Sequence, residues 1–442
     1  MSLNLSSSSM PKGRLIMIGA GVLIILVVVF GFLGIIPLFK DTNTTTDPNF
    51  PTTKVDLVLW GTEPQIAFAG AIKAYQDQHK NVQVKYTQFS DEGAYETALI
   101  NALAQGKGPD VFMVKNLWNN KYRGIMAPAY TALVTQQMIT SLFPSVVLND
   151  FVYQGNVYAS PLSLDALVLY YNKDLFNTSA LLTPPATWDE VISDSARIRQ
   201  LTASKAITQA GIALGETKNI SRFADIIGTL MMQSGAKINV ASSTAVKFDD
   251  SAQKAVNFYA QFAQSANTNY TWDQHFSSSR EAFVQGLVGM VVDYETLRSD
   301  IKKKNPFFNF GVTLLPQISG SLASQKTTFA NYWGLAVSQQ SPNRYVGWDF
   351  VKSATMNPPV SSQYLSATGK LPALNSLIQK EFGGDNDVFA RSFLIAKTWQ
   401  EPDPKIVDSA FSTMIQDVVS GKSDSRQAAA AAATIINTAA SL

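Results

Sequence analysis

Between Val55 and Val114 the sequence alternates between short apolar strand patterns and amphipathic helical patterns. Strand-forming residues dominate the first run, which stops at Gly61, and the helical patterns end near His79 and at Gly106. The expected elements are strands at 55–60, 82–86 and 109–114, and helices at 66–79 and 95–105. This alternation predicts an α/β sheet with parallel strands and ligand-binding loops at their carboxyl ends.

The rest of the chain continues the mixed pattern. A helix is expected to open at Trp188, after two prolines, and the alanine-rich tail 426–440 is helical by propensity. Further strands are expected at 166–171, 289–292, 310–315 and 334–337. No tandem repeat is visible, so the chain is not expected to form a solenoid.

An uncharged stretch, Leu15–Ile36, has about the 20 apolar residues that a membrane-spanning helix needs. Basic residues precede it, and a polar segment rich in Thr, Asn and Asp follows. The positive-inside rule then predicts a cytoplasmic N-terminus at 1–14, a transmembrane anchor at 15–36 and a flexible tether at 37–54. A cleaved signal peptide is the alternative, although its apolar core should span only ~7–15 residues. We therefore expect a single-pass protein of the cell membrane with an extracytoplasmic body.

The composition excludes several kinds of chemistry. The chain has no cysteine, two histidines (His79 and His275) and a net charge of +2. A cysteine nucleophile, disulfides and multi-histidine metal centres are therefore excluded, and no charge imbalance points to nucleic acid. We expect no catalytic residue, no metal site and no cofactor.

Three local patterns resemble functional motifs without completing them. Gly421-Lys-Ser lacks the upstream glycine of a phosphate-binding loop, and we interpret it as the turn after a helix. Asp385-Asn-Asp lacks the central glycine and the distal glutamate of a calcium loop. His275 has no partner motif, so a loop or core position is expected.

From residue 108 onward a series of segments resembles the family 1 extracellular solute-binding proteins, the maltose-binding-protein-like group of bacterial ABC importers. The matching segments are 108–112 (GPDVF), 158–167 (YASPLSLDAL), 171–176 (YNKDLF) with the following P-x-T-W-D-E, 282–290 (AFVQGLVGM), 331–338 (NYWGLAVS) with 341–344 (SPNR), and 368–372 (TGKLP). Their order and spacing extend the resemblance over nearly all of 55–442.

The resemblance implies a two-lobed periplasmic-binding-protein-like fold of type II, with ligand between the lobes and closure about a hinge. The N-lobe would comprise 55–163 and 328–371, and the C-lobe would comprise 164–327 and 372–442.

The resemblance also implies the residues that face the cleft. Asp165 falls where related sugar binders place a carboxylate that accepts hydroxyl hydrogen bonds, and Lys115 lies at the rim. The expected ligand-binding residues are Thr62, Glu63, Asn116, Trp118, Asp165, Arg222, Phe223, Asp293, Tyr294, Tyr332 and Trp333, with Asp408 and Phe411 as further candidates. Among the aromatic residues, Trp60 and Tyr171 are expected in the core instead.

The resemblance implies a monomeric, non-enzymatic protein that captures a mono- or oligosaccharide for ABC permease subunits. Aromatic faces can cover the C–H surface of a sugar while carboxylates and amides bind its hydroxyls. Two other functions stay open: an anchored glycoside hydrolase with paired carboxylates, and a module that presents its ligand to a sensor. A peptide or polyamine ligand also stays possible.

Overall fold

Five strands form the first sheet, in the order β2-β1-β3-β13-β6. Strand β1 (Val55–Gly61) pairs in parallel with β2 (Val82–Gln88) and β3 (Val111–Lys115), which confirms the predicted parallel arrangement. Strand β13 (Trp333–Val337) runs antiparallel to both β3 and β6 (Ala159–Pro161). The sheet is therefore mixed, because β13 arrives from a distant part of the sequence.

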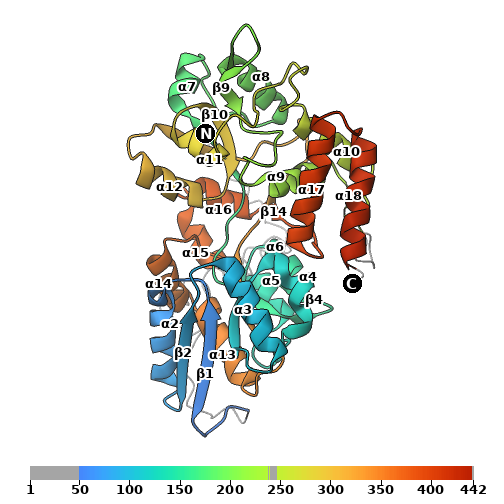
Figure 1. Cartoon of the computed structure of the whole chain (residues 1–442). Helices are drawn as coiled ribbons and strands as arrows, with labels where there is room; N and C mark the ends of the chain where they lie inside the picture. Colours follow the sequence, from blue (N-terminus) through green and yellow to red (C-terminus); the bar gives the residue numbers. More distant parts are fainter. Residues whose placement is uncertain (1–48, 237, 239–245, 441–442) are drawn as a thin grey trace, which may run out of the picture. The chain divides into compact units, whose positions relative to one another are not determined.

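The first sheet is covered by helices that lie between its first strands and by helices that follow its last strand, β13. Helix α2 (Gln65–Gln78) packs against α13 (Arg344–Met356) and α14 (Pro358–Thr368), which Figure 1 shows beside β1 and β2. Helix α3 (Glu92–Ala104) is capped by the Asp91 side chain. The remaining elements of this lobe are α4 (Asn119–Tyr122), α5 (Gln136–Leu142), α6 (Ser145–Phe151) and the hairpin of β4 (Val152–Tyr153) and β5 (Asn156–Val157).

A second five-stranded sheet has the order β11-β7-β10-β9-β8. Strand β7 (Val168–Asn172) runs antiparallel to β10 (Val288–Asp293) and β11 (Phe310–Leu314), whereas β9 (Ile207–Ile212) is parallel to β10. The edge strand β8 (Gln200–Leu201) pairs with β9. All the strands predicted in this region are present.

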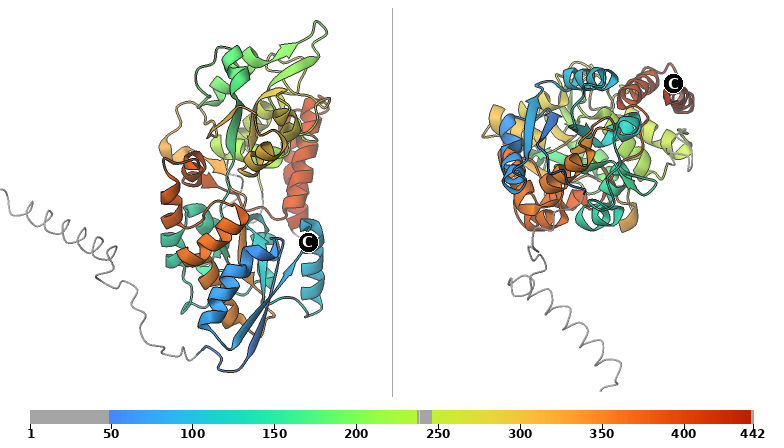
Figure 2. Two further views of the ribbon diagram at one scale, coloured as in Figure 1. Left: turned by 90° about the vertical axis from the view of Figure 1, so that its left-hand side faces the viewer. Right: turned by 90° about the horizontal axis from the view of Figure 1, so that it is seen from below.

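Helices surround the second sheet. The predicted helix at Trp188 is α8 (Trp188–Ile198), which begins with a capping box between Thr187 and Glu190. Helices α17 (Pro404–Val419) and α18 (Ser425–Ala440) lie side by side (Figures 1 and 2). The other helices are α7 (Lys173–Thr178), α9 (Phe223–Gln233), α10 (Asp250–Ala260), α11 (Ser279–Val284), α12 (Thr296–Lys304), α15 (Asn375–Ile378) and α16 (Asp387–Phe393).

Extended segments cross between the two sheets and pair with one another. One crossing connects β6 to β7, and another connects β12 (Thr328–Phe329) to β13. The Leu162 amide donates to the Trp333 carbonyl at 2.9 Å, and the Leu167 amide donates to the Phe329 carbonyl at 2.9 Å. Strand β12 also pairs with β14 (Ala396–Lys397) from the C-terminal part of the chain. The fold is thus two α/β lobes joined by hydrogen-bonded crossings.

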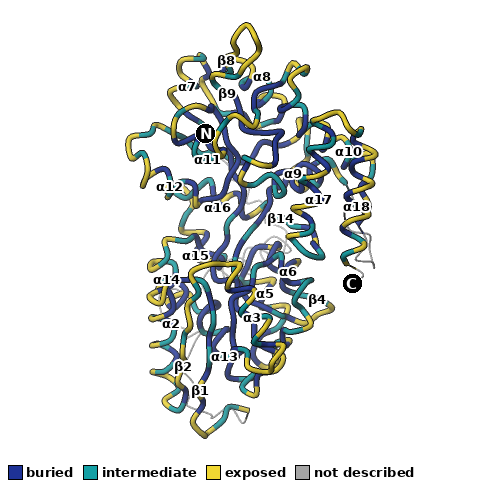
Figure 3. The backbone as a smooth tube through the Cα atoms, viewed as in Figure 1, coloured by how far each residue is buried: buried dark blue, intermediate teal, exposed yellow. Residues whose placement is uncertain are grey.

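The core of each lobe lies between its sheet and its helices, and the strands are mostly buried in Figure 3. Trp272 and Trp348 are among the largest fully buried side chains. Trp60 and Tyr171, which were expected in the core, are only half-buried because each side chain lies on a partly exposed sheet face.

This computed structural model describes residues 49–236, 238 and 246–440. The expected cytoplasmic segment 1–14, the anchor 15–36 and most of the tether 37–54 lie outside the described residues. Within the described part of the chain, none of the helices combines the length and apolar character required to span a bilayer.

The rejected motifs occupy ordinary positions. Gly421 follows α17 with a positive φ of 73°, as expected for the turn after a helix. His275 is in a loop, with 95% of its side chain exposed. Asp385 is exposed in the loop before α16.

Candidate ligand-binding site

The carboxyl ends of strands from both sheets meet the crossing segments. Strand β3 ends at Lys115 in the first sheet, and β10 ends at Asp293 in the second. Asp165 lies in the crossing between β6 and β7, where its carbonyl accepts from the Asn331 amide at 3.1 Å. Strand ends and chain crossings therefore converge at one place, which is the usual position of a ligand site in α/β folds.

Two adjoining cavities lie at this convergence. The Asp165 cavity has a volume of about 240 Å³, and the Glu401 cavity has a volume of about 290 Å³. Both are near the lower end of the ~300–1,000 Å³ range of ligand pockets. They share the lining residues Glu92, Lys115, Arg222 and Asn331. The Asp165 cavity is further lined by Ser163, Leu164, Asp165, Tyr294, Glu295, Thr296, Tyr332, Trp333, Lys370 and Leu371, and the Glu401 cavity by Leu117, Trp118, Ser221, Phe223, Ala224, Asp225, Glu401, Pro404, Lys405 and Asp408.

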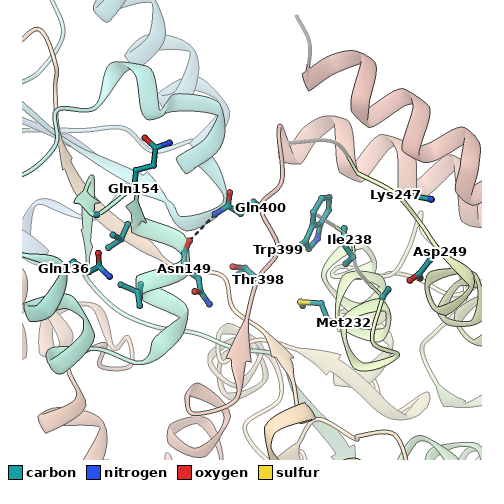
Figure 4. Close-up of a pocket in the computed structure, with 14 residues that line it drawn as sticks. Gln136, Asn149, Gln154, Met232, Ile238, Lys247, Asp249, Thr398, Trp399 and Gln400 are labelled. Atoms are coloured by element: carbon teal, nitrogen blue, oxygen red, sulfur yellow. Dashed lines mark hydrogen bonds between the residues drawn. The ribbon is translucent and has the colours of Figure 1, made fainter. Parts of the chain in front are cut away.

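A third and larger cavity, the Trp399 cavity, has a volume of about 1040 Å³. Figure 4 shows amide side chains from α5, α6 and the β4–β5 hairpin on one side and Trp399 on the other. Its charged lining residues are Lys247 and Asp249, and the Asp249 side chain already caps α10. Most of the residues predicted to bind ligand line the two smaller cavities instead, so these are the candidate site.

Asp165 is held by backbone amides at the floor of the site. Its carboxylate accepts from the Glu295 amide at 3.1 Å and from the Ala166 amide at 2.9 Å. Burial raises the pKa of the Asp165 carboxyl to about 8, and the nearby Glu295 and Asp293 carboxylates also raise it. No cation lies within ion-pair distance of Asp165 among the described residues. Its remaining acceptor capacity is available to hydroxyl or amine donors of a ligand.

Arg222 lines both cavities, and Tyr294, which follows β10, lines the Asp165 cavity. The Arg222 guanidinium donates to Asp293 at 3.2 Å and lies 5.1 Å from the centre of the Tyr294 ring. The Tyr294 hydroxyl donates to Asp225 at 2.7 Å. Phe223, at the start of α9, also lines the Glu401 cavity.

An aromatic wall comes from the N-lobe. The rings of Trp118 and Trp333 are 5.3 Å apart in an edge-to-face arrangement, and Trp118 also stacks on Tyr95 at 6.4 Å. Trp118 is buried, whereas Trp333 is half-buried, and the Lys115 ammonium lies 5.4 Å from the Trp333 ring centre. Trp333 therefore has the more accessible apolar face.

Four of the predicted site residues do not line either cavity. Thr62 donates its amide to Met113, and the Glu63 carboxylate pairs with Lys370. The other two, Asn116 and Asp293, are buried and hydrogen-bonded inside the protein.

The polar side-chain atoms of Asn116 and Asp293 form hydrogen bonds with other residues of the protein. Asn116 donates to Asp150 at 2.9 Å and accepts from the Tyr332 amide at 3.0 Å. Asp293 is fully buried and accepts from Arg280 at 2.7 Å and 2.8 Å. Both side chains hold the walls of the site in place.

Two aromatic candidates also have internal roles. Tyr332 lines the Asp165 cavity, but its hydroxyl donates to Asp150 at 2.7 Å. Phe411 was a weaker candidate, and its placement at the cleft is wrong: it is fully buried against Trp399 and Phe248, because its position on α17 faces the core. Asp408, one helical turn earlier, does line the Glu401 cavity.

The polar lining residues that were not predicted from the sequence include Asn331, Lys370 and Glu401, as well as Glu92, Ser163, Asp225, Thr296 and Lys405. The first two lie inside segments that carry the resemblance, so their proximity to the site could have been recognised. Glu401 lies between β14 and α17, outside all of those segments.

The decisive comparison is with protein families. The sequence profile of the family described as bacterial extracellular solute-binding protein matches residues 61–358, well over half of the chain. The chain belongs to this family. Its members are binding proteins, and the matched range includes β2, β3, β6 and β13 of the first sheet, the second sheet and most of the candidate site.

Individual relatives are distant. Proteins from Brucella abortus and Brucella suis are 27% identical over 212 residues, which is 47% of this chain and 48% of theirs. The chain thus aligns with about half the length of these relatives. A maltotriose-binding protein of Pyrococcus abyssi is 22% identical over 325 residues, or 70% of this chain and 64% of that protein.

Solved structures share the fold. The cyclic α-maltosyl-1,6-maltose binding protein of Arthrobacter globiformis superposes with a TM-score of 0.73 at 17% identity, covering 88% of this chain and 99% of that one. An ABC transporter solute-binding protein of Thermotoga lettingae, bound to α-D-tagatose, gives a TM-score of 0.66 at 21% identity, covering 88% and 100%. The two-lobed periplasmic-binding-protein-like fold is thereby confirmed.

The acidic and histidine side chains of the described residues were compared with the arrangement that a metal ion requires. No group of three or more His, Asp or Glu side chains within them has the geometry to hold a metal ion.

Proposed function

We propose that this solute-binding protein captures a carbohydrate outside the cytoplasm and delivers it to the permease subunits of an ABC importer. The observation that carries the proposal is the convergence of Asp165, Arg222 and Trp333 on adjoining cavities at the crossings between two lobes. A carboxylate and a guanidinium can bind hydroxyl groups, while an indole face covers the C–H surface of a sugar ring.

The relatives support a saccharide ligand. The names of the Pyrococcus abyssi protein and of the Arthrobacter globiformis protein specify maltotriose and a cyclic maltosyl-maltose. The proposed binding residues are those predicted residues that line the cavities: Trp118, Asp165, Arg222, Phe223, Tyr294, Tyr332, Trp333 and Asp408, together with Lys115.

The proposal includes the setting of the protein. The lobes are assigned to 55–163 with 328–371 and to 164–327 with 372–442, and closure brings them together around the ligand. The segment 15–36 anchors a monomeric body to the cell membrane through the tether 37–54.

Isothermal titration calorimetry of the full-length chain, in a detergent without a sugar headgroup, tests the function. The panel contains maltotriose, maltose, cellobiose and tagatose, with amino acids, a short peptide and glycerol 3-phosphate as controls. We expect selective binding of a saccharide without chemical conversion, which mass spectrometry of the recovered ligand would check.

Replacing Asp165 by Ala should weaken saccharide binding by about 10- to 100-fold, because leaving buried polar groups of the ligand without their hydrogen-bond partner costs ~1–3 kcal/mol. The matched control is Asp385→Ala, in an exposed loop. Equal affinity of the two variants would remove Asp165 from the site, and conversion of the saccharide would favour a hydrolase.

A further inference from the structure

The charges that line the two cavities do not balance. Every cationic side chain there already has a carboxylate partner, and these pairs are Lys115–Glu92 at 2.6 Å, Arg222–Asp293 at 3.2 Å, Lys405–Glu96 at 2.5 Å and Lys370–Glu63. Glu295 is paired with Arg298 at 2.9 Å. Four lining carboxylates have no ion-pair partner among the described residues: Asp165, Asp225, Glu401 and Asp408.

Glu401 is the most unusual member of this set. Only 5% of the residue is exposed, and it lines the Glu401 cavity. Its backbone is satisfied, since its amide donates to the Trp399 carbonyl at 3.0 Å and its carbonyl accepts from Asn120 at 3.3 Å. Its carboxylate has no hydrogen-bond donor among the described residues. A buried carboxylate without a partner is costly, so its presence at a cavity wall calls for a partner from outside the protein.

Two other carboxylates line the same cavity. Asp225 accepts a hydrogen bond from the Tyr294 hydroxyl at 2.7 Å, and Asp408 lies on helix α17. Burial raises the pKa of Glu401, and the neighbouring Asp225 and Asp408 carboxylates raise it further. Burial likewise raises the pKa of Asp408 to about 6. A positive charge in this cavity would relieve the repulsion among the three groups.

The other residues that line the Glu401 cavity indicate which kind of cation it can bind. Trp118 and Phe223 place aromatic surface beside the carboxylates, which suits a cation carried on an organic ring. A bare metal ion is disfavoured, because the described acidic groups lack a metal-binding arrangement. A protonated amine carries a positive charge and up to three hydrogen-bond donors, so it can pair with the unpartnered Glu401 carboxylate.

We propose that the natural ligand is an amine-bearing saccharide, and that Glu401, with Asp225 and Asp408, binds its protonated amine in the Glu401 cavity. The Asp165 cavity then holds a neighbouring neutral part of the same ligand. This inference rests on the proposed carbohydrate-binding function and specifies its substrate class.

The test compares saccharides that differ only at one substituent. Cellobiose, N,N′-diacetylchitobiose and fully deacetylated chitobiose share a β-1,4 skeleton and carry hydroxyl, acetamido and amino groups at C2. Glucose and glucosamine form a smaller pair, and spermidine supplies amines without a sugar. Titration calorimetry at pH 7 on the full-length chain gives each affinity.

We expect each free-amine saccharide to bind at least about 10-fold more tightly than its neutral counterpart, because its charged hydrogen bonds are the stronger ones. A neutral saccharide that binds as tightly as the amine-bearing ones would overturn the inference and leave the proposed function standing. Failure of every saccharide, with or without binding of spermidine, would count against the proposed function itself.

Isosteric variants locate the amine. Glu401→Gln removes the charge but keeps the shape, and we expect it to weaken amine binding by about 10- to 100-fold while changing neutral-saccharide affinity less than about twofold. Asp408→Asn should act in the same direction. Asp385→Asn, in an exposed loop, is the matched control. An amine-to-hydroxyl affinity ratio that is unchanged in both Glu401→Gln and Asp408→Asn would overturn the assignment.

Discussion

The Trp399 cavity and the pair of smaller cavities differ in what their walls offer to a ligand. The Trp399 cavity is several times larger, at about 1040 Å³ against about 240 and 290 Å³. Its polar walls are mostly neutral amides, and its Thr398 hydroxyl is already bonded to the Asp150 carboxylate. The smaller cavities combine strand ends, aromatic faces and four carboxylates that have no ion-pair partner among the described residues. We therefore place the candidate site by the carboxylates without ion-pair partners at the crossings and not by cavity size.

The largest expected effect is on the free energy of unfolding. It compares Trp399, at the Trp399 cavity, with Trp333, at the Asp165 cavity. Trp399 is 6% exposed and stacks on Phe411 at 6.2 Å, so Trp399→Ala should reduce the free energy of unfolding by about 3–5 kcal/mol. Trp333 is half-buried, and Trp333→Ala should cost only about 1 kcal/mol through its lost contact with Trp118. Urea denaturation followed by circular dichroism measures both. Equal losses would mean that Trp333 is a core residue and not a ligand platform.

The next effect is on ligand affinity, where a substitution at the smaller cavities should matter more than one at the Trp399 cavity. Trp333→Ala should weaken saccharide affinity by about 10- to 30-fold, as expected for an aromatic residue at the centre of a binding site. Asn149→Ala, an exposed position in the Trp399 cavity, should change affinity by less than about twofold. Calorimetric titration with the tightest saccharide gives both values. A large loss in Asn149→Ala would move the binding site to the larger cavity.

The smallest expected effect is a pH dependence that originates in the smaller cavities. Burial raises the pKa of Asp165 to about 8 and that of Asp408 to about 6, so the folded protein binds more protons than the unfolded chain between about pH 4 and 8. The stability of the ligand-free protein should therefore fall as the pH rises through this range.

Thermal unfolding at pH 5, 6.5 and 8 measures this slope, and we expect the midpoint to decrease by a few degrees from pH 5 to 8. Asp165→Asn should flatten the slope, because the amide does not titrate, whereas Asn149→Ala at the Trp399 cavity, which removes no titratable group, should leave it unchanged. A slope that is equally steep in Asp165→Asn would contradict the assignment of the raised pKa to this group.

Much of the candidate site could be predicted from residues that lie next to strands. Asp165 and Trp333 belong to segments that resemble the family, and each lies where a crossing meets a sheet. Their side chains line the Asp165 cavity as expected. Local sequence is informative here because a strand end determines where the following side chains can lie.

Sequence position next to a strand could not distinguish residues that face the cavities from residues of the same type that bond inside the protein. Asp293 and Asp165 are both carboxylates at strand ends, yet Asp293 is enclosed by Arg280 and Arg222 whereas Asp165 is held only by backbone amides. Asn116 was predicted to face the ligand, but its amide is used by Asp150 and Tyr332. These assignments depend on partners distant in sequence, which no local pattern specifies.

The sequence by itself determined the alternation of strands and helices, the parallel pairing of β1, β2 and β3, and membership of a solute-binding family. It did so because strand and helix periodicity and turn residues act over a few residues. The tertiary structure alone decided that Glu401 lines the cavity beside Asp225 and Asp408, and that its carboxylate has no ion-pair partner within the described part of the chain. Charge balance in a cleft is a property of side chains gathered from both lobes, so it exists only once the chain is folded.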